Sequence, residues 1–224
     1  MDFLEGIFSF LAFRLEDLPF VIITLVIAFT VHEFAHAFVA YKMGDPTAKN
    51  EGRLTLNPLV HLDPIGTLLI LLAGFGWARP VPVNRFRLRN PRLGGVLISL
   101  AGPLSNLLLA IIGVILQVII IKFAGVNVGT EFINEFFNIF IWLNAILTVF
   151  NLIPLPPLDG FRIIQDLVDN QTRSKLGQFE VYGSIIFLVL VLVDPLYNVT
   201  LRPYMEFGIN WIYELLSMIY NLIG

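Results

Sequence analysis

The chain of 224 residues has little charge and no cysteine. Only 14% of its residues are charged, against roughly 25% in an ordinary soluble domain, and 57% are hydrophobic. This composition excludes a typical soluble protein and indicates a membrane protein. The formal net charge of -3 provides no basic footprint, so we expect no nucleic-acid partner.

The lack of cysteine excludes disulfides and thiolate metal sites. Histidine is also scarce, with three residues in the whole chain. Any metal site made of imidazoles must therefore be built from His32, His36 and His61.

Long apolar runs account for most of the sequence. A helix needs about 20 residues to cross a hydrocarbon core. The candidate spans cover residues 19–41, 93–121, 136–153, 181–193 with its flanks, and 207–223. They leave no room for a sizeable soluble domain. We therefore predict an all-α polytopic membrane protein with about five or six transmembrane helices, in a single domain covering residues 1–224.

Two shorter runs need a separate interpretation. Residues 3–13 are rich in aromatic side chains and are more typical of an interfacial helix than of a span. Residues 65–78 have the length of a re-entrant or buried segment. A crossing there would leave the basic cluster of residues 42–53 or that of residues 79–92 outside, against the positive-inside rule. We predict that residues 65–78 do not cross.

The resulting topology places 11 of the 14 Lys and Arg residues on the cytoplasmic side. Arg14, Lys122 and Arg202 stay outside, together with the N-terminus. The cytoplasmic arginines of the second cluster are interpreted as topology determinants that touch anionic lipid: Arg85, Arg87, Arg89 and Arg92.

Short strands are expected in the insertion formed by residues 45–90 at the cytoplasmic membrane edge. Residues 53–57 alternate between polar and apolar side chains, which is typical of a strand. Pro80 and Pro82 push the residues before them into extended conformations. The fold prediction therefore includes a short β-strand insertion beside the re-entrant segment.

The first span contains the sequence His32-Glu33-Phe34-Ala35-His36. Residues four apart share one face of a helix, so both imidazoles can bind one Zn²⁺ while Glu33 acts as general base on water. A carboxylate inside hydrocarbon is costly unless it is paired, hydrated or linked to a metal. The alternative is a metal-free pair of buried histidines hydrogen-bonded to Glu33.

A catalytic zinc takes three protein ligands and keeps one position open. The candidates for the third ligand are Asp159, His61, Glu51 and Asp63. Asp159 is favoured because it follows a span that returns to the cytoplasmic side, where prolines stop the helix. His32 and His36 lie about 9 to 15 Å from that end of their own helix at 1.5 Å per residue. His61 is also interpreted as a group supporting the site or as a loop cap, and Asp63 as a turn or cap residue.

In these motifs the chain resembles the site-2 proteases, which are intramembrane zinc metalloproteases. The resemblance is carried in order by HEFAH, by Ala101-Gly102-Pro103-Leu104-Ser105-Asn106 and by the proline-rich Leu158-Asp159-Gly160 signature. Residues 57–67 are similar to the short bacterial and archaeal members that lack a PDZ or CBS domain.

The resemblance implies a function and a set of roles. His32, His36 and Asp159 would bind one catalytic zinc, Glu33 would be the base, and Asn106 and Asn151 would contact the substrate backbone or the oxyanion. The implied activity is cleavage of membrane-embedded or membrane-proximal peptide bonds, as in regulated intramembrane proteolysis. We expect a membrane-protein substrate, a lipid bilayer as surroundings, and a multi-pass protein of a prokaryotic plasma membrane with its active site toward the cytoplasm.

A second class of function remains open at this point. A zinc-binding membrane chaperone, adaptor or transporter could use His32 and His36 without any hydrolysis. Glu33 discriminates between the two classes, because only hydrolysis needs a base beside the metal.

Overall fold

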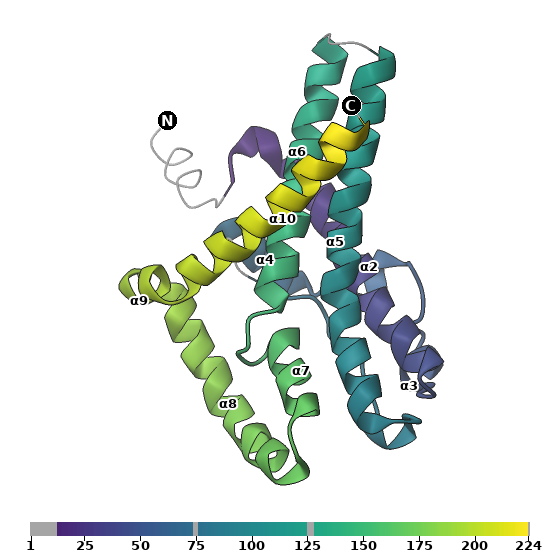
Figure 1. Cartoon of the computed structure of the whole chain (residues 1–224), viewed down its shortest axis with the longest axis vertical. Coiled ribbons are helices and arrows are strands. Elements are labelled where there is room, and N and C mark those ends of the chain that lie inside the picture. Colours follow the sequence, from purple (N-terminus) through teal and green to yellow (C-terminus); the bar gives the residue numbers. More distant parts are fainter. Residues whose placement is uncertain (1–12, 74–75, 125–127, 224) are drawn as a thin grey trace.

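The computed structural model describes residues 13–73, 76–124 and 128–223. Within these ranges the chain forms helices and irregular segments and no strand. Two long helices, α5 and α6, stand side by side, α10 lies obliquely across them, and α8 extends away (Figure 1). The interfacial helix predicted for residues 3–13 lies outside the described residues, apart from Phe13.

The described helices follow one another with short connections. In chain order they are η1 (Leu15–Asp17), α2 (Leu18–Lys42), α3 (Thr47–Asn50), η2 (Pro58–Val60), α4 (Pro64–Ala73), η3 (Arg85–Arg87), α5 (Pro91–Ala124), α6 (Val128–Asn151), α7 (Asp159–Leu167), α8 (Asn170–Leu192), α9 (Asp194–Val199) and α10 (Leu201–Ile223).

Three of these helical stretches are long and apolar enough to cross a membrane, at residues 15–42, 91–123 and 131–151. These candidate spans coincide with the first three predicted ones. The helix α8 adds a fourth if its two halves, bent by 55°, form one span. Among the described residues the predicted fifth span is not confirmed, because α10 carries charges such as Glu206 and Glu214 along its length.

The hydrophobic core lies where α5, α6 and α10 meet. Its buried residues include Ala110, Val114, Ile141, Ala145, Met205 and Ile212. Lipid chains are as apolar as these side chains, so the transfer of apolar groups out of water does not hold such helices together. Close packing and interhelical hydrogen bonds hold them instead.

Prolines shape the connection that leads to α7. The helix α6 ends at Asn151, and Pro154, Pro156 and Pro157 keep the next residues irregular until α7 begins at Asp159. Gly160 then lies so close to the carbonyl groups of Leu152 and Ile153 that a Cβ atom would not fit. The Leu-Asp-Gly signature thus places the aspartate at the first turn of a helix folded back onto its own connection.

The predicted strands in residues 45–90 do not form in the described part of that segment. Pro80 and Pro82 have no N–H group to donate to a neighbouring strand, and the backbone N–H groups near them bind side chains instead. Glu33 accepts from the N–H of Val81 at 3.0 Å, and Asp45 accepts from the N–H of Asn84 at 2.6 Å. The expectation of a β-insertion is therefore corrected to an extended segment held by side chains.

The two ends of the apolar run at residues 65–78 lie against each other. Gly66 packs directly on the backbone of Trp77, and the N–H of Arg79 donates to the carbonyl of His61 at 2.8 Å. The helix between them, α4, has 10 residues and a length of about 15 Å. The segment therefore returns to where it started.

A buried ion-pair cluster joins η3 to α7 and α8. Asp166 on α7 is 1% exposed and pairs with Arg85, and Arg173 Nη1 lies 3.5 Å from its Oδ1. Arg85 was expected to touch lipid as a topology determinant. The structure corrects this for Arg85, whose guanidinium is engaged by a buried carboxylate.

Candidate metal centre

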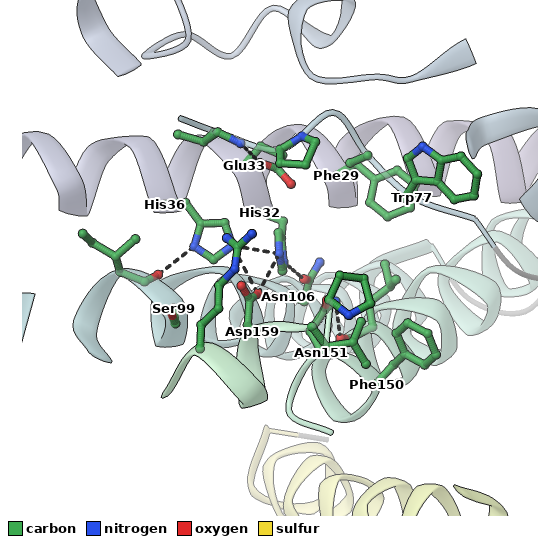
Figure 2. A pocket seen from close by; sticks show the side chains of 18 of the residues that line it. Phe29, His32, Glu33, His36, Trp77, Ser99, Asn106, Phe150, Asn151 and Asp159 are labelled. Carbon is green, nitrogen blue, oxygen red and sulfur yellow. Dashed lines mark hydrogen bonds and ion pairs between the residues drawn. The ribbon is translucent and has the colours of Figure 1, made fainter. Parts of the chain in front are cut away.

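His32, Glu33 and His36 are buried on the same stretch of α2. The helical spacing places the imidazoles one turn apart, with their Nε2 atoms 3.0 Å from each other. Both rings point toward α7 and α5, as Figure 2 shows. The local geometry predicted from the spacing is therefore present.

Asp159 reaches the same point from the start of α7. Its Oδ2 atom lies 3.2 Å from His32 Nε2 and 3.2 Å from His36 Nε2. These are the three residues that could hold a metal ion among those that the structure describes. Of the four candidates for the third ligand, the structure brings Asp159 to the histidines.

The Nδ1 partners place a proton on Nδ1 of both rings. His36 Nδ1 lies 2.6 Å from the carbonyl of Ile98, which can only accept, so this nitrogen carries the proton. His32 Nδ1 lies 2.7 Å from Asn106 Oδ1 and donates in the same way. With Nδ1 protonated, the neutral form of each ring presents the lone pair of Nε2 to the centre.

The donor set fits a zinc ion. Two Nε2 lone pairs and a carboxylate oxygen converge, and Asp159 Oδ2 is buried without a hydrogen-bond partner. Ligands about 2.0 to 2.1 Å from a tetrahedral zinc are about 3.3 Å apart, close to the separations of 3.0 and 3.2 Å here. A cation between these atoms would offset their mutual repulsion.

Gly102 lets α5 lie directly against the two imidazoles. A Cβ atom at this position would lie 2.4 Å from His36 Nε2 and 2.5 Å from His32 Nε2. The helix α5 continues through the following Pro103 to Ala124.

Glu33 faces the same cavity and is held by the extended segment. Its Oε2 accepts from the N–H of Val81 at 3.0 Å. Arg53 is buried behind that segment and donates to the carbonyl groups of Arg79 and Pro80. Burial lowers the pKa of Arg53, and the nearby Glu33 carboxylate opposes that change.

The cavity at the centre has a volume of about 180 Å³. It is lined by the metal-site residues, by Glu33 and by Asn151, whose Nδ2 donates to the carbonyl of Leu147 at 2.9 Å. Asn106 also borders it, but it is fully buried and its amide groups are taken by neighbours. The structure thus places Asn106 behind His32 instead of at a free substrate position.

The other predicted candidates lie apart from the centre. His61 is fully buried, and its Nε2 lies 2.8 Å from the carbonyl of Thr55, so it stabilises a loop. Asp63 accepts from the N–H of Gly66 at 2.8 Å, as a cap residue does. Glu51 is exposed. None of the three joins the metal group of the described residues.

Sequence reasoning missed two contributors to the site. The carbonyl of Ile98 carries no sequence signal, because any residue supplies one. Asn144 is a buried amide in a membrane helix and binds Asn106 at 3.0 Å. Polar residues inside spans are often functional, so a count of amides as well as charges would have singled it out.

The fold and the site together define a helical membrane protein with a buried His-His-Asp cluster beside a glutamate. The model of peptidase family M50 matches residues 118–193. YwhC of Bacillus subtilis, provisionally named a zinc metalloprotease, is 54% identical over 215 residues, which cover 95% of this chain and 97% of that protein. The chain belongs to peptidase family M50, the site-2 proteases, as its motifs predict.

More distant relatives carry the same kind of name. Rip2 of Mycolicibacterium smegmatis is 29% identical over 201 residues, covering 87% of this chain and 70% of that protein. MJ0611 of Methanocaldococcus jannaschii is 31% identical over 160 residues, covering 71% of this chain and 76% of that protein. No solved structure matches the chain.

Proposed function

We propose that the protein is a zinc metallopeptidase that hydrolyses peptide bonds of membrane-spanning proteins, as in regulated intramembrane proteolysis. The observation that carries this proposal is the convergence of His32 Nε2, His36 Nε2 and Asp159 Oδ2 within 3.0 to 3.2 Å, next to Glu33. The relatives named as zinc metalloproteases support the choice of metal and of reaction.

The three convergent atoms would hold one zinc ion. When bound, zinc supplies Lewis-acid chemistry, because it activates water near neutral pH and polarises a peptide carbonyl. His32 and His36 contribute fixed lone pairs through their oriented rings. Asp159 contributes the negative charge that helps to balance the cation.

Glu33 acts as the general base in this proposal. The N–H of Val81 holds its Oε2, and the residue lines the cavity beside the three convergent ligands. The carboxylate takes a proton from the attacking water and delivers it to the leaving amine. Asn151, at the cavity wall, is placed to contact the substrate backbone.

The depth of the site supports a membrane-spanning substrate. His32 and His36 lie within a helix that is long and apolar enough to cross a membrane. A substrate helix hides its carbonyl groups in internal hydrogen bonds, so it has to unwind before it can be cut. The returning segment at residues 61–79 supports a re-entrant loop at the cytoplasmic edge of a plasma membrane, beside the site.

The substitution Glu33→Gln tests this function. The variant should keep zinc, because Glu33 is not among the three convergent ligands, and should lose cleavage by a factor on the order of 100 or more. Purified protein in detergent is analysed for metal, and cleavage is followed with single-span membrane peptides labelled at both ends.

The matched control is Glu214→Gln, which changes an exposed glutamate of α10. It should leave zinc content and cleavage unchanged. Full cleavage by Glu33→Gln would refute the assigned base. Zinc binding without cleavage by the unchanged protein would favour the non-proteolytic class.

A further inference from the structure

Two asparagines lie behind His32 with no exposed surface. Asn106 on α5 and Asn144 on α6 are both fully buried, and Asn106 Nδ2 donates to Asn144 Oδ1 at 3.0 Å. A buried amide is costly in a membrane helix unless all its groups are bonded. Neither the motifs nor the proposed reaction accounts for Asn144.

The direction of each hydrogen bond follows from a backbone carbonyl. Asn144 Nδ2 donates to the carbonyl of Phe140 at 2.9 Å, and this carbonyl can only accept. The Oδ1 atom of Asn144 must then face Asn106 and accept from its Nδ2. That Nδ2 also points to the carbonyl of Ala28 at 3.4 Å.

The orientation of Asn106 then sets that of His32. With Nδ2 committed to two acceptors, the Oδ1 atom of Asn106 is the one that faces His32 Nδ1 at 2.7 Å. The imidazole proton therefore stays on Nδ1. A reversed amide would place a donor against Nδ1, move the proton to Nε2 and remove the lone pair from the metal centre.

We propose that Asn144 is a positioning residue of the metal centre, which acts through Asn106 to hold His32 in its metal-binding tautomer. This inference rests on the proposed function, because it assumes that the cluster binds zinc. The two histidines differ in the group that fixes the Nδ1 proton, since in His36 this group is the main-chain carbonyl of Ile98. The hydrogen-bonded pair of Asn144 and Asn106 thus lets α6 help to orient a metal ligand.

The same pair of helices contains a matched control. Gln117 on α5 donates to Asn138 on α6 at 2.9 Å, so this pair also joins the two helices through amide side chains. It does not line the cavity that holds the metal centre. Loss of the Gln117–Asn138 bond should affect helix packing without affecting the metal.

The experiment compares Asn144→Leu with Asn138→Leu in detergent-purified protein. Zinc affinity is measured by competition with a chelator, and the ligand geometry by the visible spectrum of the Co²⁺-substituted protein. Asn144→Leu should lose 10- to 100-fold in zinc affinity, as is typical for partners of metal-ligating histidines, and should alter the Co²⁺ spectrum. Asn138→Leu should change neither.

Asn144→Asp provides the rescue. Its carboxyl group accepts from Asn106 in either protonation state, so zinc affinity should stay within about threefold of the unchanged protein even if thermal stability falls. Asn144→Ala removes the amide without added bulk and should repeat the loss if the leucine variant fails to fold.

Three outcomes would overturn the inference. Unchanged zinc affinity in both Asn144→Leu and Asn144→Ala would exclude the relay. An equal loss in Asn138→Leu would show that helix packing alone is responsible. Failure of the unchanged protein to bind zinc would overturn the proposed function as well. This outcome is distinguishable from the first two, because it is seen in the unchanged protein and not only in the variants.

Discussion

At Gly102 the second long helix touches both imidazoles of the metal centre. The residue has a role that neither helix propensity nor turn geometry requires, because it sits inside α5 where glycine is unfavourable. The contact explains why the glycine precedes Pro103 at this depth. The metal centre therefore requires the absence of a side chain at residue 102 as well as the three ligands.

Gly102→Ala should lower zinc affinity by tenfold or more, on the order of other changes beside metal-ligating histidines. A Cβ atom 2.4 Å from His36 Nε2 would displace the ring from the centre. The measurement is chelator competition in detergent. The control Gly177→Ala, where nothing lies within 4 Å of a Cβ, should bind zinc normally. Equal affinities in the two variants would contradict this account.

Single residues differ in how well the sequence predicts them. His32, Glu33 and His36 are predictable because their geometry depends only on helical spacing. Asp159 is predicted from the expected topology, in which its span returns to the face where the helix of His32 and His36 ends. Asn144 could not be assigned a role from sequence, since its partner Asn106 lies 38 residues away and their contact depends on how α5 and α6 pack.

At the scale of elements, the segment of residues 45–90 differs most from its prediction. Alternating side chains and prolines both indicate extended backbone, but residues 53–57 bend at Leu54 and Thr55, and of the two stretches only the one around Pro80 and Pro82 is free of helix, turn and bend. The prolines do not determine the hydrogen-bond partner, which is a side chain such as Glu33 or Asp45 instead of a second strand. Sequence patterns report conformation more reliably than pairing.

Asp166 connects three elements and should contribute to their stability. Asp166→Asn leaves Arg85 and Arg173 without their buried counter-charge, and loss of one partner of a buried pair costs about 3 kcal/mol. The apparent Tm in detergent should fall by several degrees. Asp169→Asn is the control, because Asp169 is an exposed helix cap and asparagine caps equally well. An unchanged Tm for Asp166→Asn would rule out a stabilising cluster.

For the whole molecule, apolar runs predict helices well but predict crossings less well. The three helices that are long and apolar enough to cross a membrane were expected and are present. The last two predicted spans differ from these three, because α8 is bent and α10 carries charges, and whether such helices cross depends on their neighbours. The composition could not settle this, because it does not report which polar side chains are shielded by packing.

The absence of cysteine makes the proposed orientation directly testable. A single Glu51→Cys or Glu131→Cys substitution supplies the only thiol of the chain. With a membrane-impermeant maleimide on intact cells, the cysteine at position 131 should be labelled and the one at position 51 only after lysis. The reverse pattern would invert the topology and move the active site to the outer face.

The zinc content of purified protein with and without Asp159 tests the metal centre most directly. The unchanged protein and Asp63→Ala should each carry about one zinc per chain, because Asp63 only caps α4. Asp159→Ala should lose the metal, because its Oδ2 is the sole carboxylate oxygen at the two Nε2 atoms in the described structure. A full complement of zinc in Asp159→Ala, or none in the unchanged protein, would contradict the metal centre described above.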